Sequence, residues 1–200
     1  MHNRYGPVLG SLLLFLLMAC NSVYTPKPRG YFRIDFPKHA YQSFNNPDFP
    51  YSFDYPVYGA IIRDTSFFGD KPDTPYWLNV DFPRFHARIY ISYKKVEGNN
   101  FARLREDAYK MTYKNTYKAT SIEDSLISTP LGVHGVFFHV GGDAATANQF
   151  FVSDSVKHFL RGALYFDTTP NEDSLSIVNQ FLQKDMYHLI NSLRWKNGRG

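Results

Sequence analysis

The sequence predicts an α+β fold in a single domain: an antiparallel sheet accompanied by two amphipathic helices. Apolar residues recur with a period of two in several short runs, and with a helical period in two longer ones. The strand-like runs are grouped together and the helical runs are segregated from them, as in α+β rather than alternating α/β domains. No internal repeat interrupts this order, so we expect one globular domain over residues 31–200.

The first residues have the pattern of an export signal, which we place at residues 1–19. Arg4 precedes an apolar run from Val8 to Met18. Its length of about 11 residues suits a signal peptide and is short of the roughly 20 needed to cross a bilayer. The run ends Leu17-Met18-Ala19-Cys20, which resembles the lipobox of bacterial lipoproteins. We therefore expect cleavage before Cys20 and acylation of its thiol with chains such as palmitate; the alternatives are a secretory signal without lipid and a buried helix.

The single cysteine and the charge balance narrow the function further. Cys20 is the only cysteine, so its acylation leaves no thiol for a disulfide, a metal or redox chemistry. The chain has 22 basic and 18 acidic residues, and no run of basic residues exceeds two. A nucleic-acid partner is therefore not expected, because such proteins carry a clustered basic face.

Residues 20–30 are predicted to be a lipidated tether. Asn21 to Gly30 reads NSVYTPKPRG and contains two prolines. If this segment is polyproline-like, about ten residues at ~3.1 Å each reach roughly 30 Å. The folded domain would then stand close to the membrane surface.

Strands are predicted on both sides of the first helix from alternation of apolar and polar residues. Before that helix they are Phe32–Phe36, Phe49–Tyr55, Tyr58–Arg63, Leu78–Phe82 and Phe85–Tyr93, the last two forming a hairpin. After it they are Ile122–Ser128, Val133–Val140, Asn148–Ser153 and Val156–Phe166. Gly141-Gly142 and Asp154-Ser155 supply turns.

The two helices are predicted at residues 101–115 and from Thr169 onward. Gly98-Asn99-Asn100 offers an N-cap to the first, whose apolar stripe is Phe101, Leu104, Ala108 and Met111. In the second, Thr169 is the expected cap, Pro170 the first helical residue and Glu172 the partner in a capping box. Its stripe is Leu175, Val178, Leu182, Met186, Leu189 and Leu193. The order of elements resembles the PsbP-like α/β/α sandwich, an analogy of fold alone.

Motifs for catalysis are scarce. Ser92 to Lys95 fits S-x-x-K, but the partner motifs of that enzyme class are absent from the sequence. His134 and His139 point to opposite faces of one predicted strand and cannot share a metal without a bulge. His158 shares a face with apolar neighbours and is expected to be half-buried. The sequence thus predicts no enzyme, no catalytic residue, no metal site and no cofactor.

Two sets of residues are candidates for binding. Arg29, Tyr31 and Arg33 lie between the tether and the domain and are partner-binding candidates, since Arg and Tyr often anchor interfaces. The alternative is that they only begin the first strand. Trp77 is a candidate for stacking on glycan rings, against the alternative that it fills the core.

Several segments together resemble the gliding-motility lipoprotein GldD family of Bacteroidota. They are the lipobox at Cys20, YTPKPRGYFRIDFP (24–37), YPVYGAIIRD (55–64), WLNVDFPRFHARIYISYK (77–94) and the closing SLRW (192–195). The resemblance implies a non-catalytic accessory of gliding motility and of type IX secretion, with protein partners in the cell envelope. By the same resemblance to lipoproteins of that phylum, surface-displayed members usually carry acidic residues just after the cysteine. Asn21–Tyr24 has none, so the resemblance favours a domain that faces the periplasm, from either membrane. A glycan- or peptidoglycan-binding module and an envelope hydrolase remain alternatives.

Overall fold

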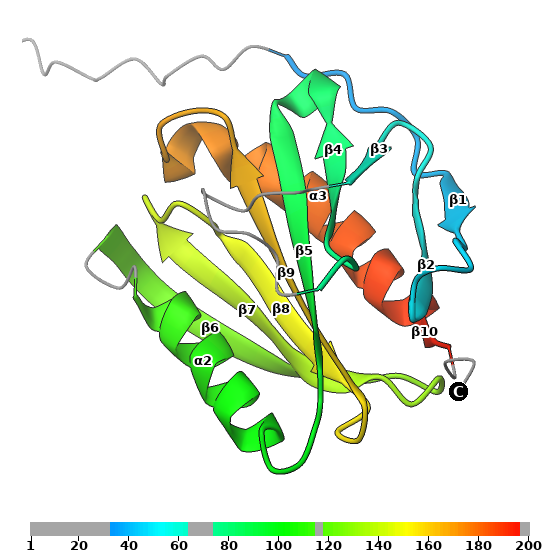
Figure 1. The fold of residues 1–200 in the computed structure, drawn as a ribbon. Coiled ribbons are helices and arrows are strands. Elements are labelled where there is room, and N and C mark those ends of the chain that lie inside the picture. The colour runs from blue at the N-terminus through cyan, green and yellow to red at the C-terminus, as the bar shows by residue number, and fades with distance from the viewer. Residues whose placement is uncertain (1–32, 64–73, 115–117, 197–200) are drawn as a thin grey trace, which may run out of the picture. The chain divides into compact units, whose positions relative to one another are not determined.

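The computed structural model describes residues 33–63, 74–114 and 118–196 (Figure 1). Cys20, Arg29 and Tyr31 lie outside these residues, so the boundaries predicted for the signal peptide and the tether stay predictions. The chain divides into two compact units, Met1–Ile34 and Asp35–Gly200. Everything described below belongs to the second unit unless stated otherwise. None of its described helices is both long and apolar enough to cross a bilayer.

Seven strands form one antiparallel sheet in the order β3-β4-β5-β9-β8-β7-β6. Their bounds are β3 Ala60–Arg63, β4 Leu78–Phe82, β5 Ala87–Lys95, β6 Ala119–Ser128, β7 His134–Gly142, β8 Asn148–Ser153 and β9 His158–Phe166. A smaller sheet has the order β1-β2-β10, formed by β1 Tyr41–Phe44, β2 Tyr51–Pro56 and β10 Arg194–Trp195. The helices are α2 Phe101–Tyr113, α3 Glu172–Ser192 and the short 3-10 helix η1 Pro83–Phe85.

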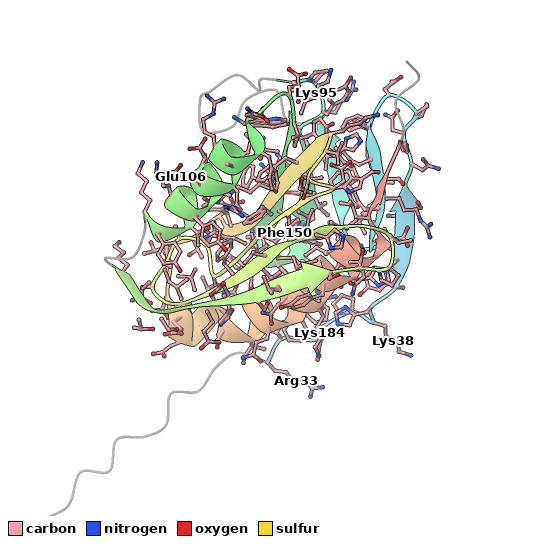
Figure 2. All side chains as sticks on the ribbon, turned by 90° about the horizontal axis from the view of Figure 1, so that it is seen from below. Arg33, Lys38, Lys95, Glu106, Phe150 and Lys184 are labelled. Atoms are coloured by element: carbon pink, nitrogen blue, oxygen red, sulfur yellow. The ribbon has the colours of Figure 1, made fainter. Side chains whose placement is uncertain are left out.

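The two helices cover opposite faces of the large sheet. Successive residues of a strand point to opposite sides, and alternate residues of β8 pack against different helices. In β8, Phe150 and Val152 belong to the larger core, together with the apolar stripe of α3. Phe151, between them, belongs to a smaller core with Leu104 and Ala108 of α2. In Figure 2, the labelled Phe150 lies in the interior, whereas Lys95, Glu106 and Lys184 lie at the surface. The predicted α+β class, with an antiparallel sheet and two helices, is confirmed.

Most predicted strands are present within a few residues of their expected bounds, but the first one is wrong. Residues 33–40 have no regular secondary structure, and the first strand of the described residues is β1. The ring of Phe36 stacks on Phe181 of α3 with 4.4 Å between centroids, and it also contacts Phe85. Packing against α3 therefore takes the place of strand pairing in this segment.

Both helices are confirmed, and their ends differ from the prediction in detail. Asn100 is the N-cap residue of α2, but its side chain makes no capping bond: its oxygen accepts from the backbone N–H of Glu97 and its nitrogen donates to the carbonyl of Lys95. Helix α3 begins at Glu172, with Asn171 as the cap that accepts from the N–H of Ser174. The expected cap at Thr169 is therefore wrong by two positions.

The buried stripes follow the predicted helical period with specific exceptions. In α2, Met111 is 51% exposed and Thr112 is buried in its place, one turn after Ala108. In α3, the predicted residues from Val178 to Leu193 are buried, and Leu175 is half-buried. The same helix also buries the carboxylate of Asp185, which is 1% exposed. Asp185 is not among the residues that the helical period predicts to be buried.

Candidate functional site

Asp185 lies on the apolar stripe of α3, three residues after Leu182 and four before Leu189. Both leucines are buried in the main core, so the helical period carries the carboxylate into the protein interior. Its side chain is fully buried. An ionised carboxylate without partners would be very costly at such a place. The packing of α3 in this position therefore requires hydrogen-bond partners for the carboxylate of Asp185.

Three side chains from the N-terminal part of the unit surround the carboxylate. His39 Nδ1 lies 2.7 Å from Oδ1, and the hydroxyl of Tyr41 donates to the same oxygen over 3.0 Å. The hydroxyl of Tyr58 donates to the other oxygen, Oδ2. Since an ionised carboxylate only accepts hydrogen bonds, Nδ1 of His39 is assigned as the protonated nitrogen. We call these four residues the Asp185 cluster.

Aromatic rings enclose the Asp185 cluster. Phe181, one turn before Asp185, stacks on the imidazole of His39 with 4.4 Å between centroids. His188 stacks on the ring of Tyr41 at 3.4 Å and 8° between planes. Its Nε2 lies 3.9 Å from a carboxylate oxygen of Asp54 on β2. The cluster thus joins α3 to the small sheet through both hydrogen bonds and ring contacts.

The two phenols of the cluster are held in their neutral form. Burial, and then the charge of Asp185, raise the pKa of Tyr41 to about 12. Burial, followed by the hydrogen bond to Asp185, raises the pKa of Tyr58 well above its usual value. Both hydroxyls are therefore donors at any physiological pH. Chemically, the arrangement is a hydrogen-bonded crosslink between the segment of residues 39–58 and the C-terminal helix.

A second buried group is His158 on β9, which the sequence placed as a half-buried histidine. It is 6% exposed, and its Nδ1 lies 2.7 Å from the hydroxyl of Tyr93 on β5. The imidazole stacks on Trp195 of β10 with 5.0 Å between centroids. Burial lowers the pKa of His158, against the opposite effect of the Asp154 carboxylate. This histidine joins the large sheet to the C-terminal strand.

Of the residues predicted as binding candidates, the structure describes Arg33 and Trp77. Arg33 is exposed at the start of the described residues, in the first unit. Trp77 is partly buried against the main core, and its indole N–H donates to the carbonyl of Tyr93 over 3.0 Å. The indole thus has a structural use, and its role in glycan stacking stays a prediction.

Within the described ranges, no group of three or more His, Cys, Asp or Glu side chains could hold a metal ion. His139 Nδ1 lies 3.2 Å from the side-chain oxygen of Asn148, and His134 Nδ1 lies 3.3 Å from the hydroxyl of Ser128. The alternation along β7 turns these two histidines to opposite faces of the sheet.

Two hollows lie on the surface of the described part of the chain. One, of about 120 Å³, lies between β7 and the start of α3 and is lined by His139, Glu172 and Asn179 among others. The other, more open and of about 490 Å³, lies where β5 meets α2, with Lys94, Lys95, Arg103 and Glu97 in its wall. Neither hollow is lined by Asp185 or Trp77.

The Asp185 cluster could have been suspected from one signal in the sequence. An acidic residue at a position where the helical period expects an apolar one is a candidate for a buried, partnered carboxylate. Its partners gave no such signal, since His39 and Tyr58 are 146 and 127 residues away in sequence. Only the packing of α3 on the small sheet brings them together.

Comparison with known proteins gives the following matches. A family described as "Gliding motility lipoprotein GldD" matches residues 21–195. No curated protein matches the chain. Among solved structures, the solution structure of cyanobacterial PsbP (CyanoP) from Synechocystis sp. PCC 6803 is similar, with a TM-score of 0.44 and 12% sequence identity. The similarity covers 85% of this chain and 98% of the cyanobacterial one.

Proposed function

This chain belongs to the gliding motility lipoprotein GldD family, and from that premise we propose that it is a non-catalytic accessory of the gliding machinery. In this proposal it also serves the type IX secretion system that is coupled to gliding, and it acts through contacts with other envelope proteins. An acylated Cys20 holds it on a membrane, and its domain faces the periplasm.

The observation that carries this proposal is that the polar groups of the Asp185 cluster bond to one another. A buried carboxylate, an imidazole and two phenols are the kinds of group from which catalytic sites are made. Here they bond to one another and join two distant parts of the chain. This use supports a domain built to keep one shape while it binds partners, rather than one that turns over a substrate.

The anchor gives such a domain its place of action. Each buried methylene of an acyl chain contributes ~0.8 kcal/mol, so two or more chains hold a protein stably on a bilayer. The tether of residues 20–30 leads into the segment that carries His39 and Tyr41. In this proposal, a load on the folded unit passes through the Asp185 cluster toward the membrane.

Deletion of the gene tests the function. We expect colony spreading and secretion through the type IX system to fall together in the deletion strain, and both to return with the wild-type gene. Normal spreading and secretion in the deletion strain would overturn the proposal.

The anchor is tested separately by Cys20→Ser, with Ser22→Ala as a matched control in the same segment. The Cys20→Ser protein should incorporate no labelled palmitate and should leave the membrane fraction, whereas Ser22→Ala should behave like the wild type. A Cys20→Ser protein that is still processed and membrane-bound would exclude acylation as the anchor.

A further inference from the structure

Strand β6 (Ala119–Ser128) forms one end of the large sheet, opposite β3 (Figure 1). It pairs with β7 along its length, from Ala119 opposite Gly142 to Ser128 opposite His134. In the part of the chain that the structure describes, no strand lies on its other side. The outer edge of β6 therefore presents backbone N–H and C=O groups that a further strand could pair with.

This edge has only part of the protection that proteins usually give a sheet edge. Such protection includes very short strands, charged side chains (lysine above all), proline and bulges. The opposite edge strand, β3, is only four residues long. By contrast, β6 has ten residues, ATSIEDSLIS, with no proline and no basic side chain, and its register shift is confined to Ala119 and Ser121.

One apolar side chain on this strand is unusually exposed. Leu126 is 87% exposed, while its neighbour Ile127 is buried in the main core. Alternation along the strand therefore places Leu126 on the face of the sheet that α2 covers farther along. Asp124 shares that face; burial and then the charge of Asp124 raise the pKa of Tyr109 on α2. The side chains that an incoming strand presents on this face would contact Leu126.

The charge of the edge indicates what kind of strand fits. Glu123 and Asp124 are both exposed, and β6 contains no Lys or Arg to balance them. If two copies paired antiparallel through this edge, each face of the sheet would continue into the same face of the other copy, so only residues that share a face could lie opposite one another. In the two registers of greatest overlap, Glu123 would lie opposite Glu123 of the second copy, or Asp124 opposite its Asp124. Like charges directly opposite one another destabilise a pair of strands. Opposite charges stabilise it, so a basic strand fits this edge better than a second copy does.

We propose that β6 is the docking edge for an extended segment rich in Lys and Arg from another envelope protein, which adds to the sheet as a further strand. This inference rests on the proposed function, since it names the surface through which the domain contacts its partner. Main-chain hydrogen bonds would supply the affinity, and the two carboxylates with Leu126 would supply the selectivity.

The test is photo-crosslinking in cells that express the full-length lipoprotein. A photoreactive amino acid is placed at Asp124 or Leu126, and at Val156, 68% exposed in a turn away from this edge, as a control. We expect both β6 positions to link to the same basic segment of one other protein, at sites two residues apart. The Val156 position should not link to that segment.

Charge reversal supplies the matched variants. Glu123→Lys with Asp124→Lys should lower crosslinking from Leu126 at least tenfold and should abolish spreading at normal protein abundance. Asp48→Lys with Glu97→Lys reverses two exposed acids elsewhere and should change neither result. If the β6 variant loses abundance, Leu126→Lys is compared with Val156→Lys in the same two assays.

Four crosslinking outcomes would overturn the inference: links to a second copy, links to this chain's own residues 20–32, links that survive charge reversal, or a complete absence of links from β6. These failures are distinguishable from failure of the proposed function. If the deletion strain stops spreading while all β6 variants spread normally, the function stands and the docking edge is wrong.

Discussion

Nδ1 of His39 lies 2.7 Å from Oδ1 of Asp185, although 146 residues separate them in the sequence. The contact connects the segment before β1 with the middle of α3. The hydroxyls of Tyr41 and Tyr58 donate to the same carboxylate. Together these contacts stabilise the buried carboxylate and form a junction between the small sheet and the C-terminal helix. The stability of the domain should therefore depend on this junction more than on any ion pair at the surface.

Removal of the Asp185 carboxylate should be strongly destabilising. Asp185→Ala leaves the donors of His39, Tyr41 and Tyr58 without their acceptor inside the protein, so we expect the free energy of unfolding to fall by about 3 kcal/mol. Urea unfolding of the purified lipoprotein measures this. Asp48→Asn, at an exposed position, should stay within about 0.5 kcal/mol of the wild type. A loss as small for Asp185→Ala would contradict the role of the cluster.

The raised pKa of Tyr41 predicts a specific loss of stability in alkali. The phenol ionises near its usual value of 10.0 in the unfolded chain and at about 12 in the folded one. Its contribution to stability is therefore complete below pH 10 and is lost as the pH rises toward 12. Between these values the free energy of unfolding should fall more steeply for the wild type than for Tyr41→Phe. Equal slopes would show that Tyr41 ionises alike in both states.

The lowered pKa of His158 predicts a loss of stability in mild acid. Because burial disfavours the charged imidazole, the unfolded chain binds this proton at a higher pH than the folded one does. The contribution is complete above the usual histidine value of 6.5 and is lost as the pH falls through the lowered pKa. A His158→Gln variant should show a shallower dependence on pH below 6.5, measured by urea unfolding at several pH values.

A control for that experiment is Tyr93→Phe, which removes the hydroxyl partner of His158 but keeps the imidazole buried. It should retain a steep dependence on pH, because burial is the largest cause of the shift. A flat profile in Tyr93→Phe would instead assign the effect to the hydrogen bond.

Gly162 on β9 should not tolerate a larger residue. A Cβ at this position would lie 2.3 Å from Cε1 of Phe150, whose ring is fully buried. Gly162→Ala should therefore cost about 1–3 kcal/mol through overpacking, measured by thermal or urea unfolding. In the double variant with Phe150→Leu, the loss should be less than the sum of the two single losses. Additive losses would mean that the glycine serves some other purpose.

Local patterns predicted most of the strands and both helices, but not β1 or β10. The alternation in Leu78–Phe82 and the helical stripe of Val178 to Leu193 appear in the structure as β4 and α3. Local patterns failed where a side chain had a partner elsewhere. The alternation around Phe36 predicts a strand, but its ring stacks on Phe181. Asn100 is the N-cap residue of α2, but its side chain bonds to Lys95 and Glu97 instead of to the helix.

The sequence by itself determined the class of fold and the positions along the chain of most strands and of both helices. The reason is that burial of one face imposes a period on neighbouring residues. It also carries the lipobox pattern at Cys20, which is local by nature. Only the tertiary structure decided which groups surround Asp185 and which strand is left at the end of the sheet. Both depend on contacts between residues far apart in the chain, and the separation leaves no periodic trace in the sequence.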